Sequence, residues 1–101
     1  MSSLLETVNR DSEGFLVDPN EWSEALAHEF ASELGLSLGE RHFVVINFMR
    51  DEYNKKGVIP SMRAIGKRSG VPIKELYQLY PKGPAKKAAM CAGLGKPKGC
   101  I

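Results

Sequence analysis

The chain has 101 residues, of which 43% are hydrophobic and 26% are charged, so its composition indicates one globular domain with a modest core. No apolar run approaches the roughly 18 residues of a membrane-spanning helix, and the N-terminus lacks a signal-peptide pattern, so we expect a cytoplasmic protein without membrane contact. The net charge of +2 conceals an asymmetry, because residues 82–101 contain five lysines and no acidic residue. This basic end is either a solvated helix face with a tail or a segment attracted to an acidic cleft, an anion or nucleic acid.

The N-terminal third is predicted to hold a short β element and then a helix. A turn signal at Glu13 and Gly14 precedes the apolar residues 15–17, which is typical of a small strand or hairpin. Asp18 is a suitable helix cap and Gly35 a suitable helix end, so a helix is predicted between them. Apolar side chains repeat at helical spacing on its inner face: Trp22, Leu26 and Phe30.

Four further helices are predicted from their capping and stop signals. A capping box at residues 37–40 begins a long helix that stops at Gly57. Shorter helices are predicted over residues 62–69, 72–80 and 85–92. We therefore expect an α+β fold that is mainly α: a small N-terminal β-hairpin or meander packed on an orthogonal array of about five helices, with a flexible C-terminal arm.

Residues 61–80 are predicted to form a helix-turn-helix-like unit, because two short helices are joined by a tight turn at Gly70. Its basic side chains are candidates for nucleic-acid contact, which would make the chain a DNA-binding regulator: Arg63, Lys67, Arg68 and Lys74. The other interpretation is that these helices complete the core. His28 and His42 are far apart in sequence and have no cysteine near them, so no metal site and no cofactor are predicted.

The C-terminal residues 91–101 are predicted to be a flexible arm on a body formed by residues 1–90. Three glycines and one proline between positions 93 and 99 leave too little apolar surface to order this segment. The penultimate residue, Cys100, places a thiol at the tip of the arm, where it can reach into another protein. In a cytoplasmic protein this arrangement favours a transient redox or sulfur-transfer role over a structural disulfide.

Cys91 is the second cysteine of the chain and has two interpretations. It follows Lys87 by four residues, so on a helix the ammonium group would favour its thiolate. The glycine-rich segment would then let it form a disulfide with Cys100, which would make the chain a redox-sensing interaction protein. In the second interpretation, Cys91 is a small apolar side chain that faces the core.

The C-terminal segment carries a specific set of motifs: YPKGPAKKAA at residues 80–89, AGL at 92–94 and KPKGCI at 96–101. These motifs closely resemble the DsrC/TusE family, which includes the gamma-subunit-like protein of dissimilatory sulfite reductase and the sulfur-relay protein of tRNA thiolation. The resemblance covers nearly the whole chain after its first residues and extends back through residues 14–16, 21–23 and 42–53.

The resemblance implies a sulfur-carrier protein, in which the penultimate Cys100 accepts sulfane sulfur as a persulfide and delivers it to a partner. It implies an upstream donor of the DsrEFH/TusBCD type and a downstream acceptor such as a sulfite reductase or a tRNA-thiolating enzyme. The chain would then be a protein co-substrate rather than a stand-alone enzyme. Docking to partners is assigned to basic and arm residues: Lys86, Lys87, Lys96, Pro97, Lys98 and Gly99.

Two departures from the family pattern modify this expectation. The second cysteine of members that partner sulfite reductase aligns with Ala89, whereas Cys91 lies two residues later, about 200° around a helix. If Ala89 faces the arm, Cys91 points into the body, so we expect a buried, slowly alkylated thiol and a single working cysteine. Gly95 replaces the family's usual proline and should loosen the arm. The alternative is a gamma-subunit-like partner of dissimilatory sulfite reductase that uses a Cys91–Cys100 disulfide.

Overall fold

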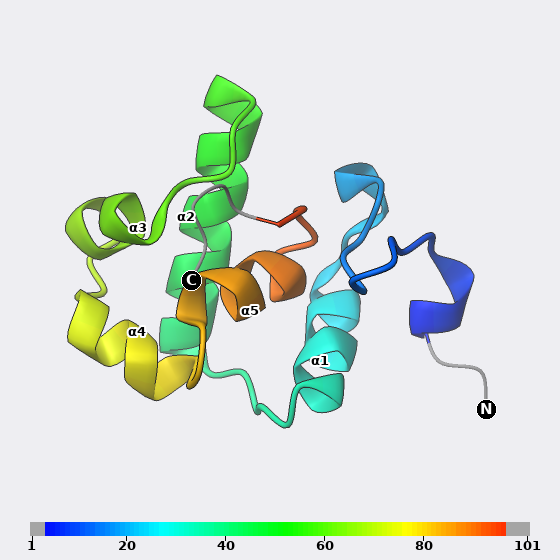
Figure 1. Cartoon of the computed structure of the whole chain (residues 1–101), viewed down its shortest axis with the longest axis horizontal. Helices are drawn as coiled ribbons and strands as arrows, with labels where there is room; N and C mark the ends of the chain where they lie inside the picture. Colours follow the sequence, from blue (N-terminus) through cyan, green and yellow to red (C-terminus); the bar gives the residue numbers. More distant parts are fainter. Residues whose placement is uncertain (1–3, 97–101) are drawn as a thin grey trace.

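The computed structural model describes residues 4–96, which form two short 3-10 helices and five α-helices. In chain order they are η1 (Leu4–Thr7), η2 (Pro19–Glu21), α1 (Glu24–Glu33), α2 (Glu40–Lys56), α3 (Met62–Arg68), α4 (Ile73–Leu79) and α5 (Pro84–Cys91). Figure 1 shows α5 across the middle of the structure, with α1 on one side and α2, α3 and α4 on the other. α5 contacts α1, α2 and α4, so the last helix joins the two sides of the body.

Local signals set the start of α3 and the end of α2. Ser61 begins α3, because its hydroxyl accepts a hydrogen bond of 3.2 Å from an amide in the first turn. α2 ends at Gly57, which has the left-handed φ of 71° common at helix ends. The start of α2 differs from the prediction: the cap is Gly39 rather than Ser37, and Nδ1 of His42 accepts the Gly39 amide at 3.1 Å.

The helix predicted between Asp18 and Gly35 is in fact two elements. The Asp18 carboxylate accepts a hydrogen bond of 2.9 Å from the Asn20 amide and caps only η2. Trp22 is extended, with φ −69° and ψ 146°, and Ser23 then caps α1. Because Trp22 stands outside the helix, its ring lies against the end of α5 instead of joining the inner face of α1.

The predicted β-hairpin or meander is wrong. Residues 4–96 contain no β-strand and only one isolated bridge, between Arg10 and Leu16, so the described chain is all-α rather than α+β. The side chain of Asp11 explains the difference, because its Oδ1 accepts the amides of Glu13 and Phe15, each at 2.9 Å. Phe15 and the next residue are also both buried, whereas neighbouring side chains of a half-buried strand point to opposite faces.

α5 is buried on nearly all sides. Its buried side chains are mostly small, which lets α1, α2 and α4 approach it closely: Pro84, Ala85, Ala88, Ala89, Met90 and Cys91. Next to its start, Tyr80 is fully buried and donates a hydrogen bond of 3.0 Å to the backbone carbonyl of His42. Among residues 4–96, no helix combines the length and the apolar character needed to cross a membrane.

Candidate functional site

The C-terminal end of α5 is the point from which the chain leaves the body. It ends in a Schellman motif, in which Gly93 adopts a left-handed φ of 72°. The amide of Gly93 donates to the carbonyl of Met90 at 3.1 Å, and the amide of Leu94 donates to the carbonyl of Ala89 at 3.0 Å. These bonds leave two carbonyls at the end of the helix, those of Cys91 and Ala92, in need of other donors.

Trp22 and Arg50 supply those donors from two distant parts of the chain. The indole Nε1–H of Trp22 donates to the Cys91 carbonyl at 2.8 Å, and Nη1 of Arg50 donates to the Ala92 carbonyl at 2.8 Å. The guanidinium group also lies over the indole ring, 4.2 Å from its centroid, and Nη2 reaches the Pro19 carbonyl at 3.3 Å. A cation at the negative end of a helix dipole adds to this favourable geometry.

The Arg50 guanidinium carries its charge in a half-buried position. Burial lowers the pKa of Arg50 from its ordinary value, but an arginine keeps its proton at any physiological pH. We refer to Trp22 and Arg50 together as the carbonyl clamp. The sequence did not point to this pair, because periodicity assigned Trp22 to the inner face of a helix and no signal singled out Arg50.

The chain stays in contact with the body beyond the clamp. Leu94 is 1% exposed and belongs to the core, and Gly95 passes beside Ile59. Lys96 then forms an ion pair of 3.1 Å with Glu13 at the surface. Burial through Leu94 favours an arm that begins a few residues after the predicted boundary at residue 90, and this division of the chain stays a prediction.

Cys91 is fully buried in the last turn of α5, so its expected burial is confirmed, although not for the reason that was expected. Burial raises the pKa of its thiol to about 12, so the thiolate that sulfur chemistry requires is scarce at neutral pH. The predicted assistance from Lys87 is absent, because its ammonium group instead donates to the carbonyl of Pro81 at 2.5 Å. One premise was wrong: Ala89 is as deeply buried as Cys91, so the two residues do not divide between an arm face and a body face.

The predicted docking residues Lys86 and Lys87 lie beside the root of the arm. They line a pocket of about 360 Å³, the lysine pocket, formed by Lys82, Lys86, Lys87, Glu13, Glu33, Leu34 and Met90. Its two acidic side chains are already paired with other cations, Lys96 and Arg10. The lysine pocket therefore carries a surplus of positive charge.

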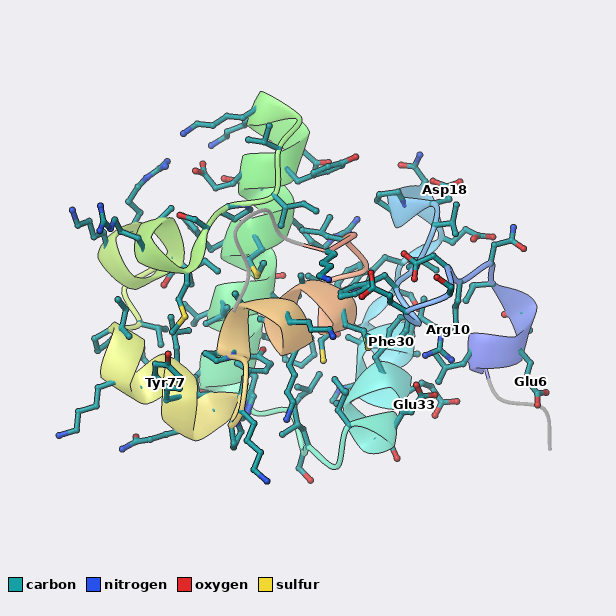
Figure 2. All side chains as sticks on the ribbon, viewed as in Figure 1. Glu6, Arg10, Asp18, Phe30, Glu33 and Tyr77 are labelled. Atoms are coloured by element: carbon teal, nitrogen blue, oxygen red, sulfur yellow. The ribbon has the colours of Figure 1, made fainter. Side chains whose placement is uncertain are left out.

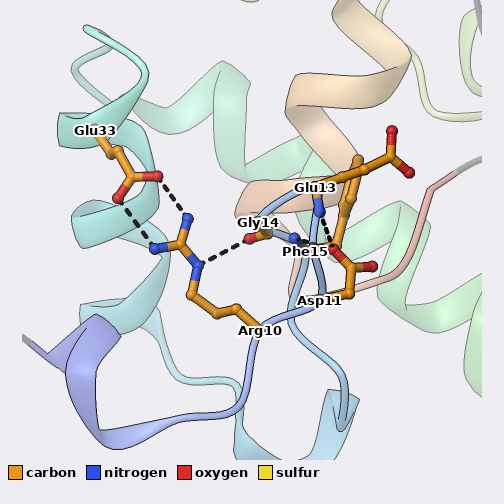
Figure 3. A network of polar contacts seen from close by, with 6 residues as sticks. All are labelled: Arg10, Asp11, Glu13, Gly14, Phe15 and Glu33. Atoms are coloured by element: carbon orange, nitrogen blue, oxygen red, sulfur yellow. Dashed lines mark hydrogen bonds and ion pairs between the residues drawn. The ribbon is translucent and has the colours of Figure 1, made fainter.

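An arginine that the sequence did not single out holds the N-terminal turn in place. Figure 3 shows Arg10 between the turn and α1: its Nε donates to the Gly14 carbonyl at 2.9 Å, and its two Nη atoms bind the Glu33 carboxylate at 2.5 and 3.2 Å. These bonds hold the pKa of Glu33 below its ordinary value. The guanidinium group also lies over the ring of Phe30, 5.2 Å from its centroid. Figure 2 labels Arg10, Phe30 and Glu33 near one another beside α1. The network fixes the turn that carries Glu13, the partner of the arm.

The helix-turn-helix-like unit is formed by α3 and α4, which pack on each other. All four of its candidate nucleic-acid residues, Arg63, Lys67, Arg68 and Lys74, are exposed. Arg68 nevertheless differs from the other three, because it forms an ion pair of 2.6 Å with the buried Glu52. DNA binding through this unit stays a prediction.

The two histidines have separate surroundings. His28 is exposed and lies against Phe43, with ring centroids 5.4 Å apart. His42 is half-buried, and because Nδ1 accepts the Gly39 amide, the proton lies on Nε2 and is donated to the Leu79 carbonyl at 2.9 Å. His42 therefore joins the start of α2 to the end of α4.

The predicted persulfide carrier, Cys100, lies outside the described residues, as do Pro97, Lys98 and Gly99. Their assigned roles stay predictions. The structure describes the arm only as far as Lys96.

Comparison with known proteins places the chain in a family. Residues 5–101 match the model of a family described as DsrC like protein. The chain belongs to the DsrC-like family. The resemblance inferred from the C-terminal motifs is thus confirmed.

Two relatives from the DsrC-like family cover nearly the whole chain. The sulfurtransferase TusE of Pectobacterium atrosepticum is 40% identical over 102 residues, 94% of each chain. The gamma subunit of the dissimilatory-type sulfite reductase of Nitratidesulfovibrio vulgaris is 37% identical over 92 residues, which cover 90% of this chain and 88% of the subunit. Proteins similar to this chain therefore include one named as a sulfurtransferase and one named as a subunit of a sulfite reductase.

Solved structures from the DsrC-like family have the same fold. The DsrC of Allochromatium vinosum, determined by NMR, superimposes with a TM-score of 0.80 at 39% identity, over 93% of this chain and 90% of that one. The oxidized gamma subunit of the Archaeoglobus fulgidus dissimilatory sulfite reductase also gives a TM-score of 0.80, at 36% identity, over 93% and 92% of the two chains.

Proposed function

We propose that this member of the DsrC-like family is a sulfur-relay protein that carries sulfane sulfur as a persulfide on Cys100. Relatives named as a sulfurtransferase and as a sulfite reductase subunit support the relay role. The observation that favours Cys100 is the burial of the other cysteine: Cys91 is fully buried, and its pKa is raised to about 12. A thiol with those properties is a poor nucleophile, so the penultimate cysteine is left to react.

The transfer is a pair of thiol exchanges without net oxidation. The Cys100 thiolate attacks the outer sulfur of a donor persulfide, a new S–S bond forms, and the donor's S–S bond breaks. The donor leaves as a thiolate with the bonding electron pair, and the persulfide proton exchanges with water. In the second step an acceptor thiolate attacks the outer sulfur on Cys100, which leaves as a thiolate.

The body is proposed to present the arm to two protein partners in turn. The donor is proposed to be a DsrEFH/TusBCD-like protein and the acceptor a sulfite reductase or a tRNA-thiolating enzyme. The lysine pocket, with Lys86 and Lys87, and the arm residues from Lys96 to Gly99 are proposed to dock on acidic surfaces of these proteins. In this role the chain is a protein co-substrate.

The proposal is tested by incubating the protein with glutathione persulfide and measuring its intact mass. The wild type is expected to gain the mass of one sulfur atom, and Cys100→Ser is expected to gain none. The matched control is Cys91→Ala, because a serine at that position would bury an unpaired hydroxyl group. The proposal fails if Cys100→Ser takes up as much sulfur as the wild type.

Burial of Cys91 also weighs against the alternative that uses a Cys91–Cys100 disulfide. The end of α5 would have to leave the core before Cys91 could be reached, since the residues around it, Met90 and Ala92, are buried as well. Peptide mapping after mild oxidation decides the matter. A rapidly formed bridge between the two cysteines in the monomer would restore the redox-switch alternative.

A further inference from the structure

We propose that Trp22 and Arg50 are positioning residues for the sulfur transfer proposed for Cys100: by holding the carbonyls of Cys91 and Ala92, they set the point from which the chain can extend from the body towards that thiol. The donors come from separate elements, the end of η2 and the middle of α2, and they meet on two consecutive carbonyls. Two residues of the body would thus contribute to a reaction that takes place on the arm.

The clamp completes the hydrogen bonding of the helix end from which the arm departs. The last carbonyls of a helix have no partner within the helix, and the Schellman motif at Gly93 satisfies only those of Ala89 and Met90. Without the clamp, the next two carbonyls would be unpaired in a position where Cys91 and Ala92 are fully buried. Unwinding of the last turn would let water satisfy them.

The two clamp residues also hold each other. The Arg50 guanidinium lies 4.2 Å from the centroid of the Trp22 ring and uses its remaining Nη group on the Pro19 carbonyl. Loss of either side chain therefore weakens the placement of the other. The ring of Trp22 also closes the space beside Gly93, where an added Cβ would lie 2.5 Å from Cδ1.

The number of residues beyond the last buried side chain limits how far Cys100 can lie from the body. Six residues follow the buried Leu94 up to Cys100, and a chain of six residues spans at most about 20 Å when fully extended. If the chain came free from Cys91, nine residues would span about 30 Å. A longer tether lowers the effective concentration of the thiol at a partner's site, by about half for this change of length.

Distance measurement between two spin labels tests the inference directly. One label is placed on Cys100 and the other on Asn54→Cys, an exposed position one turn from Arg50 on α2, with Cys91→Ala as background. Trp22→Phe removes the indole donor and keeps an aromatic ring, and Arg50→Met removes the guanidinium group and keeps an apolar stem. The matched control is Arg41→Met, because Arg41 binds the Gly70 carbonyl and Glu75 away from the arm.

The expected result is a new population at longer distances in Trp22→Phe and in Arg50→Met, extending the reach by about 10 Å, with no such population in Arg41→Met. An unchanged distribution in both clamp variants overturns the proposal, and so does equal broadening in the control. If Arg50→Met does not fold, as judged by circular dichroism, Trp22→Phe decides alone.

Persulfide loading separates this inference from the proposed function. A small donor such as glutathione persulfide diffuses to the thiol wherever the arm lies. Loading within twofold of wild type is therefore expected in Trp22→Phe, Arg50→Met and Arg41→Met when they are made without Asn54→Cys. Failure of the wild type to load would overturn the proposed function. The distance distributions would still decide whether Trp22 and Arg50 restrain the arm.

Discussion

The indole ring of Trp22 fills the space into which a side chain on Gly93 would project. A Cβ built on Gly93 would lie 2.5 Å from Cδ1 of Trp22 and 2.8 Å from its Cβ and Cγ, which is closer than side-chain carbons approach one another. The φ of 72° at Gly93 independently disfavours any L side chain. Gly95 differs in both respects, because its φ is not left-handed and its nearest neighbour, Ile59 Cδ1, would be 3.8 Å away.

Gly93→Ala is therefore expected to destabilise the fold by about 2–4 kcal/mol, through backbone strain and displacement of the indole ring. Gly95→Ala is the matched control and should change the free energy of unfolding by less than about 0.5 kcal/mol. Urea denaturation of both variants measures the difference. Equal stabilities would show that the end of α5 is not packed as described.

Cys91 is expected to alkylate only when the protein unfolds. Its thiol is fully buried and has a pKa of about 12, so both access and ionisation oppose the reaction at pH 8. Intact mass after iodoacetamide treatment should show one modified cysteine in native protein and two in urea. Rapid double modification without denaturant would contradict the burial of Cys91.

The same pKa predicts a loss of stability in alkali. The unfolded chain ionises Cys91 above its ordinary pKa of about 8.5, while the fold keeps the thiol neutral up to about 12, so unfolding releases a proton in this window. The stabilisation is complete below pH 8.5 and falls as the pH rises, with a slope approaching about 1.4 kcal/mol per pH unit.

Cys91→Ala tests this prediction, because it removes the titrating group at a cost of about 1 kcal/mol at neutral pH. Between about pH 9 and 10 the variant should lose less stability than the wild type. Above that range Tyr80, whose pKa burial also raises, adds a similar loss in both proteins. Parallel stability curves for the two proteins from pH 7 to 10 would refute the assigned pKa shift.

Glu52 is expected to make the fold sensitive to acid. Burial alone would raise the pKa of Glu52, but Lys56 at 3.3 Å and Arg68 at 2.6 Å outweigh it and hold the pKa below its ordinary value. The stabilisation is present above the unfolded pKa of about 4.3 and is lost as the pH falls through the lower folded value.

The melting temperature of Glu52→Gln should accordingly fall less than that of the wild type as the pH is lowered from 5 to 2. A second comparison uses Arg68→Met, which removes the ion pair with Glu52 and should lower the melting temperature at pH 7. Lys67→Met is the control, because its exposed side chain should tolerate the change. An Arg68→Met variant as stable as the control would remove Arg68 from the body's ion pairs.

Most helices could be predicted from the sequence, because their signals are local. Ser61 and Gly57 act through hydrogen bonds and φ angles within one turn, and the helix limits that they indicate are those of the structure. The β-hairpin prediction failed at residues 13–17 because the Asp11 carboxylate takes two amides that a strand ladder would have used. The apolar pattern of those residues does not indicate that the Asp11 carboxylate would compete for their amides.

The carbonyl clamp could not be predicted for a different reason. Trp22 and the carbonyl it binds are 69 residues apart in the chain, and Arg50 is 42 residues from its own partner. Periodicity assigned Trp22 to the face of one helix and gave no role to Arg50, whereas the polar atoms of both side chains bind carbonyls at the end of α5. The motif around Trp22 was visible only as part of the family resemblance.

The position of Trp22 has a consequence for observing the protein at work. It is the only tryptophan in the chain, and its indole ring is both hydrogen-bonded and stacked beneath a cation at the point where the arm departs. Its fluorescence is therefore a natural optical signal from the root of the arm. A partner that draws residues 91–94 out of the body would change that emission in unmodified protein, and rapid mixing could follow the event in real time.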